Sequence, residues 1–309
     1  MASFFSINII LTALEVGLIY ALVALALFVS FSILNIADLS TDGCFTLGCA
    51  VGATLTIAGH PILALFAAMA AGVVSGYVTA FLQTRLGVES ILAGIIVNTG
   101  LYTINLAVMG FSANLSIFGK DTVFSLTKPL LGGGALSRAI LLLIIVGVLC
   151  AALSRFFSTS LGLSIRATGD SPAMVSASSI NPAHTITVGL CLANSLTGLA
   201  GCLIGQYNKT CDINLGTGMV TIALASLIIG EVFARKKRSI PWRIGCVVLG
   251  SIVYRFIVAL ALRLNVPTEF FKLVSAVIVA VAIAAPSVRQ RIRLGQAMRS
   301  HRKGGDANA

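Results

Sequence analysis

The sequence predicts an all-α, polytopic bundle of membrane-spanning helices. Hydrophobic residues make up 57% of the chain and charged residues only 10%, which leaves too little polar surface to cover a water-soluble globule. Apolar runs about as long as a bilayer crossing, roughly 20 residues, recur from end to end. Lysine and arginine residues gather at the ends of these runs. These observations predict that lipid surrounds most of the chain.

The apolar runs predict crossings, in chain order, at 8–34, 44–58, 61–83, 90–110, 138–157, 183–208, 216–233, 242–262 and 268–285. The first run has no basic residues before it, contains Glu15 and is longer than the apolar core of a signal peptide. We therefore expect it to be retained as the first helix.

The second run, 44–58, is short and rich in glycine. It is either a full crossing or a broken, re-entrant helix that lines a cavity, because irregular backbone survives at membrane depth only where protein or water satisfies it. If it crosses fully, the total is about nine, within a range of about 8 to 10. Small residues at helix-packing spacing, such as Gly72 with Gly76 and the series Gly198, Gly201 and Gly205, predict close helix contacts within the chain.

The orientation follows from the basic residues. The net charge is +11, and the densest basic groups are 235–238 and the tail beyond Ser287. The positive-inside rule places both groups in the cytoplasm and the N-terminus outside. The basic residues form no stripe with interleaved aromatic residues, so we expect no nucleic-acid partner. The predicted organisation is one transmembrane domain, 1–286, with a cytoplasmic loop at 158–182 and a basic cytoplasmic tail at 287–309.

Sequence patterns of catalysis and nucleotide binding are missing. The chain has no GxxxxGK[ST] motif, and its three histidines lie far apart in the sequence. We therefore expect no catalytic residues, no metal site, no cofactor bound by this chain and no enzymatic activity of its own.

Ionisable residues within the apolar runs need a structural or functional reason, because charge at membrane depth is costly. Glu15 and Arg255 are the clearest examples. They could form a buried ion pair, extend towards the lipid interface, or contact a carboxylate substrate. Polar side chains on otherwise apolar helices either bond across helices or line a path; they are Asn98, Asn105, Asn194 and Gln206.

The polar stretch SLGLSIRATGDSPAMVSASSINP, 160–182, interrupts two apolar runs. Asp170 or Ser171 can cap a helix, Pro172 suits its first turn, and Asn181 with Pro182 ends it. The result is a helix of about two turns that presents Met174 and Val175. Because so short a helix is unstable alone, it needs a partner or the membrane surface.

This stretch resembles the cytoplasmic loop of ABC importer permeases of the branched-chain amino acid and ribose type, in which a coupling helix docks on the ATPase subunit. The segments YALVALALFVSFSILNIADLSTDGCFTLGCAVGA and ILAGIIVNTGLYTINLAVMG resemble most closely the subgroup associated with tryptophan and tyrosine uptake. The resemblance extends from about Tyr20 to Pro286. It implies that the residues coupling the chain to an ATPase are Gly162, Arg166, Gly169, Asp170, Pro172, Met174 and Val175.

The resemblance further implies a permease subunit in the bacterial cell membrane that forms the translocation pathway for amino acids, including aromatic ones. Two copies would form the pore, two ATPase subunits would hold ATP and magnesium, and a lipid-anchored or periplasmic binding protein would deliver substrate. Candidate residues of the pathway or its gate are Asn35, Asp38, Asp42, Gly43, Phe45, Asn98, Asn105 and Asn194. Two other classes remain open: a stand-alone secondary carrier that couples through Glu15, Arg255 and an ion, and a structural scaffold.

Overall fold

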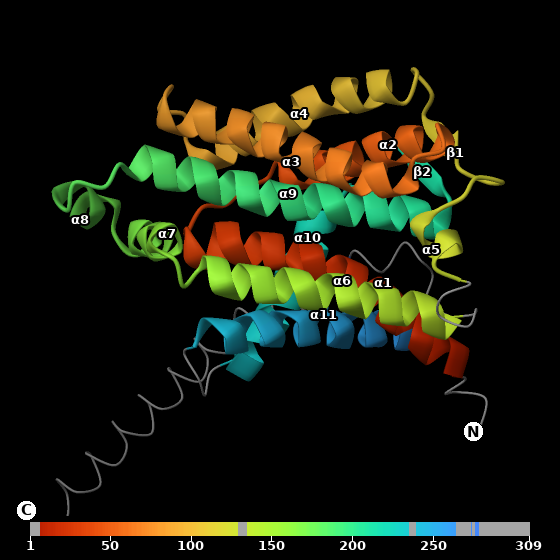
Figure 1. The fold of residues 1–309 in the computed structure, drawn as a ribbon. Coiled ribbons are helices and arrows are strands. Elements are labelled where there is room, and N and C mark those ends of the chain that lie inside the picture. Colours follow the sequence, from red (N-terminus) through yellow and green to blue (C-terminus); the bar gives the residue numbers. More distant parts are fainter. Residues whose placement is uncertain (1–6, 129–134, 235–238, 264–272, 274–275, 278–309) are drawn as a thin grey trace, which may run out of the picture.

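The structure is a computed structural model that describes residues 7–128, 135–234 and 239–263, with 273, 276 and 277. The chain forms a bundle of helices that run roughly parallel or antiparallel to one another (Figure 1). Apart from residues 273, 276 and 277, the predicted last crossing, 268–285, lies outside the described residues, as do the basic group 235–238 and the tail 287–309.

Six helices in the described part of the chain are long and apolar enough to cross a membrane. They match six predicted runs and confirm the predicted class of fold. The first is α1, Ile7–Leu27, which continues into a π-helical segment, η1, Phe28–Ile33. The others are α3, Pro61–Thr84; α4, Ser90–Val108; α6, Ala135–Phe156; α9, Pro182–Asn208; and α11, Ile240–Arg263.

Two helices inside the described bundle are apolar but shorter than the roughly 20 residues that a crossing needs. Helix α2 covers Thr41–Ile57, 17 residues, and α10 covers Met219–Ala234, 16 residues. Helix α2 begins beside the middle of α9, where the Cys44 thiol donates to the carbonyl oxygen of Asn194 at 3.3 Å. Helix α10 in turn begins beside the first turn of α2. Irregular segments, 34–40 and 213–218, lead to these two helices. Such backbone is what the broken-helix alternative expects before α2, and α10 has the same arrangement.

Helices α1 and α9 form the centre of the bundle. The apolar windows of these two helices are 78% and 83% buried, whereas those of α3, α4 and α6 are 33%, 28% and 28% buried. The outer helices therefore leave apolar side chains exposed, as helices in contact with lipid do. Glycines bring α9 close to α2 and α3: a Cβ at Gly201 of α9 would collide with the carbonyl oxygen of Phe45 of α2, and one at Gly72 of α3 with that of Asn194 of α9. The predicted contacts through small residues are thus made within the chain.

A small ribbon closes one end of the bundle, here called the β end. Strand β1, Asn114–Ser116, pairs antiparallel with β2, Thr210–Asp212, with Leu115 opposite Cys211. The short helix α5, Val123–Leu126, lies nearby. The side chain of Gln206 links α9 to α5 and α3 at this end. It accepts a hydrogen bond from the Val123 N–H at 2.9 Å and donates one to the Pro61 carbonyl at 3.1 Å. This confirms that Gln206 bonds across helices.

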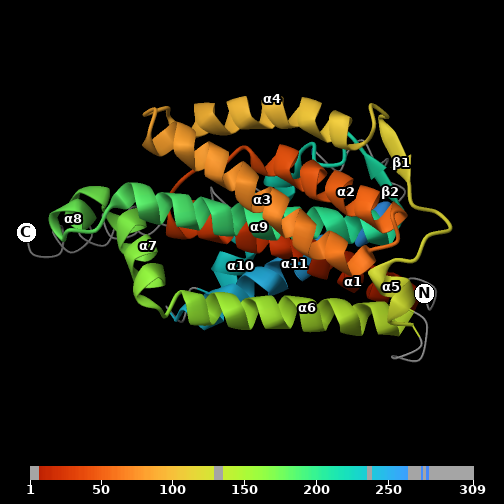
Figure 2. The ribbon, with the colours of Figure 1, turned by 45° about the horizontal axis from the view of Figure 1, so that its top comes forward.

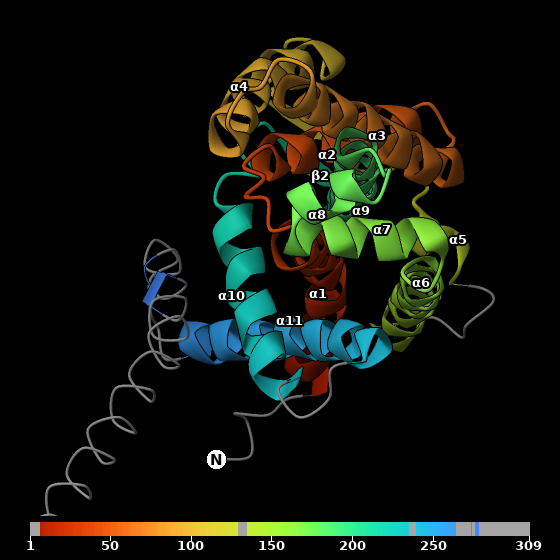
Figure 3. The ribbon, with the colours of Figure 1, turned by 90° about the vertical axis from the view of Figure 1, so that its left-hand side faces the viewer.

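The opposite end, here called the α8 end, carries α7, Ser160–Asp170, and α8, Pro172–Ala177. Figure 2 shows α7 turning away from the end of α6 towards α8 and α9. Figure 3 looks onto this end and shows α7 lying across the ends of the long helices. The positive-inside rule, applied to the sequence, assigns the α8 end to the cytoplasm.

Candidate functional site

The first turn of α2 and the start of α10 meet at the carboxylate of Asp42. Its Oδ2 accepts a hydrogen bond from the Gly218 N–H and its Oδ1 accepts one from the Val220 N–H, each at 2.9 Å. These amides belong to the start of α10, where N–H groups lack helical partners, so Asp42 acts as a cap supplied from another helix. The Gly216 N–H also donates to Thr46 Oγ1 at 3.1 Å. Segment 213–218 is thereby held against α2.

The irregular segment 34–40 is held by a second polar group. Asp38 Oδ1 accepts from the Ser40 N–H at 2.8 Å, and Asp38 Oδ2 accepts from Asn194 Nδ2 at 2.9 Å. All three side chains are buried. A buried carboxylate needs such donors, because an unpaired charge away from water is costly. Asn35 opens the segment with a left-handed backbone, φ 56°, which asparagine tolerates better than most residues.

A pocket of about 260 Å³ opens between α2, α4 and the segment before α10. Its lining residues are mostly polar; they are Asp42, Gly43, Thr46, Asn98, Thr99, Tyr102, Asn105, Ile213, Asn214 and Thr217. Four of the predicted pathway residues, Asp42, Gly43, Asn98 and Asn105, therefore come together here. The other four do not line it: Asp38 and Asn194 hold segment 34–40, Asn35 is exposed, and Phe45 is buried against Tyr20 with ring centroids 6.3 Å apart.

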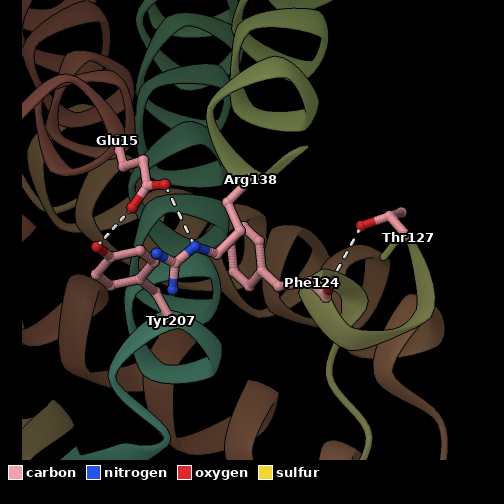
Figure 4. A network of polar contacts seen from close by, with 5 residues as sticks. All are labelled: Glu15, Phe124, Thr127, Arg138 and Tyr207. Atoms are coloured by element: carbon pink, nitrogen blue, oxygen red, sulfur yellow. Dashed lines mark hydrogen bonds and ion pairs between the residues drawn. The ribbon is translucent and has the colours of Figure 1, made fainter. Parts of the chain in front are cut away.

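Glu15 belongs to a network near the β end, shown in Figure 4. Its Oε1 lies 3.3 Å from Arg138 Nε, and its Oε2 accepts a hydrogen bond of 2.7 Å from the Tyr207 hydroxyl. The Arg138 guanidinium also lies over the Tyr207 ring, 5.5 Å from its centroid. The network joins α1, α6 and α9.

Of the three alternatives for Glu15 and Arg255, an ion pair between the two is not formed in the described part of the chain, because the partner of Glu15 is Arg138. Arg255 instead lies over the ring of Tyr20, 4.2 Å from its centroid. Glu15 is fully buried, so it does not reach the lipid interface either. Sequence analysis missed Arg138 and Tyr207 as partners. One signal pointed to Arg138: a basic residue at the outer end of an apolar run is unusual under the positive-inside rule and needs a counter-charge.

A second polar cluster, which sequence analysis also missed, lies towards the α8 end. Arg243 Nη2 donates to Glu231 Oε1 at 2.9 Å and to Ser32 Oγ at 2.7 Å, while Ser32 also donates to Glu231. The Arg243 guanidinium lies 5.0 Å from the centroid of the Phe28 ring. This cluster ties η1 to α10 and α11, and no short sequence motif reveals it because the residues lie far apart in the chain.

The predicted coupling loop forms two helices where one was expected. Ser171 caps α8 by accepting from the Met174 N–H at 3.4 Å, whereas Asp170 is the last residue of α7. Pro172 occupies the first turn of α8, as predicted. Asn181 caps the start of α9 by accepting from the Ala183 N–H at 3.0 Å. The prediction that it ends the preceding helix is therefore incomplete, since α8 stops at Ala177.

The side chains of this loop divide into exposed and packed groups. Met174 is 72% exposed, but Val175 is only 3% exposed, so Val175 is not presented on the surface as predicted. Two glycines allow close backbone contacts: a Cβ at Gly162 would collide with the carbonyl oxygen of Phe156, and one at Gly169 with that of Ile33. Among the described residues, Arg166 and Asp170 form no ion pair with each other.

The fold and its polar centre define a multi-pass helical membrane protein with a pocket between α2, α4 and the segment before α10. Residues 9–283 match the model of the family described as the permease component of branched-chain amino acid transport systems. The chain belongs to this family, and it is therefore a transport-system permease.

Two relatives extend this result. The chain is 30% identical over 276 residues to a protein of Clostridioides difficile named tyrosine transport system permease protein. This match covers 89% of this chain and 90% of the relative. The chain is also 33% identical over 231 residues to an uncharacterized protein of Rickettsia prowazekii. This match covers 72% of this chain and 77% of that protein. No solved structure matches the chain.

Proposed function

We propose that this chain is the membrane-spanning subunit of an ATP-driven importer in the bacterial cell membrane, and that it carries aromatic amino acids such as tyrosine. Two copies form the translocation unit, two ATPase subunits bind at the α8 end, and an extracytoplasmic binding protein delivers substrate at the β end. The name of the C. difficile relative supports the substrate class. The permease itself binds no nucleotide; ATP and magnesium belong to the ATPase subunits.

The observation that carries this proposal is the structure of the coupling loop within a chain of this family. Helix α8 presents the exposed Met174, while α7 lies with Gly169 directly against the backbone of Ile33. Ile33 ends η1, which leads into segment 34–40 and on to Asp42. A push on α8 by an ATPase therefore reaches the pocket through backbone contacts, and the long helices then tilt as rigid bodies.

The test is reconstitution of the full chain in lipid vesicles, alone and with the ATPase and binding protein of the same organism. The chain alone should neither hydrolyse ATP nor take up tyrosine. Both activities should appear when the partner proteins and ATP are added. Uptake driven by a proton or sodium gradient without ATP would contradict the proposal and favour the secondary-carrier class.

A further inference from the structure

The pocket between α2, α4 and segment 213–217 contains an acceptor with no partner. Asn105 is only 1% exposed, and its Nδ2 donates to the Gly43 carbonyl at 3.1 Å. This bond fixes the orientation of the amide, because the group facing a carbonyl must be the NH₂. Asn105 Oδ1 is then left buried with no hydrogen-bond partner among the described residues, in a side chain that lines the pocket. A buried acceptor without a donor is unfavourable, so the site favours a ligand that supplies one.

The charge of the pocket selects the kind of donor. Asp42 is the one ionisable acid among the ten described lining residues, and none of them is lysine, arginine or histidine. The α10 amides that Asp42 caps are those of Gly218 and Val220. They are therefore occupied and do not attract a substrate carboxylate, as the open end of a broken transporter helix would. An unpaired carbonyl oxygen in a pocket that a carboxylate also lines suits a cationic donor.

The size and lining of the pocket suit a small amino acid with a ring. Its volume of about 260 Å³ is just below the roughly 300–1,000 Å³ that drug-sized ligands occupy. Tyr102 lines the pocket with its side chain half exposed. Its ring can contact an apolar or aromatic side chain while the amino group lies near Asn105 and Asp42.

We propose that this pocket binds the ammonium group of the transported amino acid, with Asn105 Oδ1 and the Asp42 carboxylate as its acceptors. This inference rests on the proposed function and deepens it, because it assigns a substrate-recognition step to the permease itself. A carrier of aromatic acids that lack an amino group would need a basic residue at this place.

The test measures binding to the isolated full-length chain in lipid nanodiscs, with no ATPase or binding protein present. Labelled tyrosine is displaced by tyramine, which keeps the ammonium group, or by 3-(4-hydroxyphenyl)propionate, which keeps the carboxylate. Tyramine should displace tyrosine at a concentration at least about tenfold lower than the acid does, the ratio expected for one hydrogen bond to a charged group. Equal displacement by the two compounds, or none by tyramine, overturns the inference.

Variants locate the site. Asn105→Leu should weaken tyramine binding at least about tenfold, whereas Asn114→Leu, on the exposed strand β1, should leave it unchanged. Asn98→Asp adds negative charge at the pocket without removing a hydrogen bond described here, so it should strengthen tyramine binding and weaken that of the acid. This second variant keeps the test decisive if Asn105→Leu fails to fold. Unchanged binding in a folded Asn105→Leu chain would mean that water satisfies the carbonyl oxygen, and the inference would fall.

The binding test and the uptake test distinguish a failure of the ammonium site from a failure of the proposed function. If ATP-driven uptake fails but tyramine binds as described, the importer assignment fails and the ammonium site stands. If ATP-driven uptake of tyrosine occurs but Asn105→Leu binds tyramine normally, the importer assignment stands and the ammonium site falls.

Discussion

The hydroxyl of Tyr207 donates a hydrogen bond of 2.7 Å to the carboxylate of Glu15. It connects α1 and α9, the two most buried long helices of the described part of the chain, close to the β end. Arg138, on α6, forms an ion pair with the same carboxylate, and its side chain is 36% exposed. Because Glu15 itself is fully buried, its carboxylate is bonded by these partners in place of water.

Tyr207→Phe should therefore destabilise the protein. The change removes one hydrogen bond to a buried carboxylate and should lower the free energy of unfolding by about 1.5–3 kcal/mol. Thermal unfolding in detergent measures the effect. Tyr77→Phe, at an exposed tyrosine on α3, is the matched control and should have little effect. Equal losses in the two variants would show that the bond to Glu15 adds no stability.

Asn194→Leu should destabilise the segment before α2. It takes the Nδ2 donor from Asp38 and leaves that buried carboxylate with fewer hydrogen bonds, at a cost of about 1–3 kcal/mol. Asn208→Leu, at the exposed last residue of α9, is the control. Hydrogen exchange of residues 34–44 should increase in the first variant only. Unaltered exchange there would mean that Asn194 does not hold the segment.

Gly201→Ala and Gly147→Ala should have opposite effects. A Cβ at Gly201 collides with the backbone of Phe45, so α2 and α9 must separate, at a cost of about 1–3 kcal/mol. Gly147 has no atom within 4 Å of the added Cβ, and alanine there should stabilise α6 by about 0.5–1 kcal/mol through higher helix propensity. Melting temperatures of the two variants check the signs. A stabilising Gly201→Ala would refute the close contact.

Met174→Glu and Val175→Glu separate docking from folding. Glutamate at the exposed Met174 should change the free energy of unfolding by less than about 0.5 kcal/mol, yet uncouple ATP hydrolysis from uptake in the reconstituted complex. Glutamate at the buried Val175 should destabilise the chain itself by more than about 2 kcal/mol. ATPase activity per tyrosine transported is the readout for Met174→Glu. Normal coupling in that variant would remove Met174 from the docking surface.

The sequence was sufficient for the long helices and the class of fold, because the length of an apolar run is itself the physical requirement for crossing lipid. It also placed Pro172 in the first turn of α8 and narrowed the cap to Asp170 or Ser171, of which the structure uses Ser171. It did not predict the partner of Glu15. Depth in the membrane can be counted along a run, but the direction in which a side chain points depends on how the helices are rotated and packed.

The polar centre shows the same limit. Asn98 and Asn105 could be marked as polar residues on apolar runs, and Asp42 through the family resemblance, but their meeting in one pocket depends on where α2 and α10 begin. Those starting points are set by contacts between residues 156 to 178 positions apart, such as Asp38 with Asn194 and Asp42 with Val220. Local propensity carries no information about such pairs.

Asp42 also serves two helices at once. As an acid in the first turn of α2 it has a favourable position in that helix, and through Gly218 and Val220 it fixes the start of α10. The two helix starts are therefore joined through one carboxylate. Segment 34–40 connects α2 to η1, and segment 213–218 connects α10 to β2. Whatever moves the start of α2 therefore also moves the start of α10, because the Asp42 carboxylate belongs to the first helix and bonds to the backbone of the second.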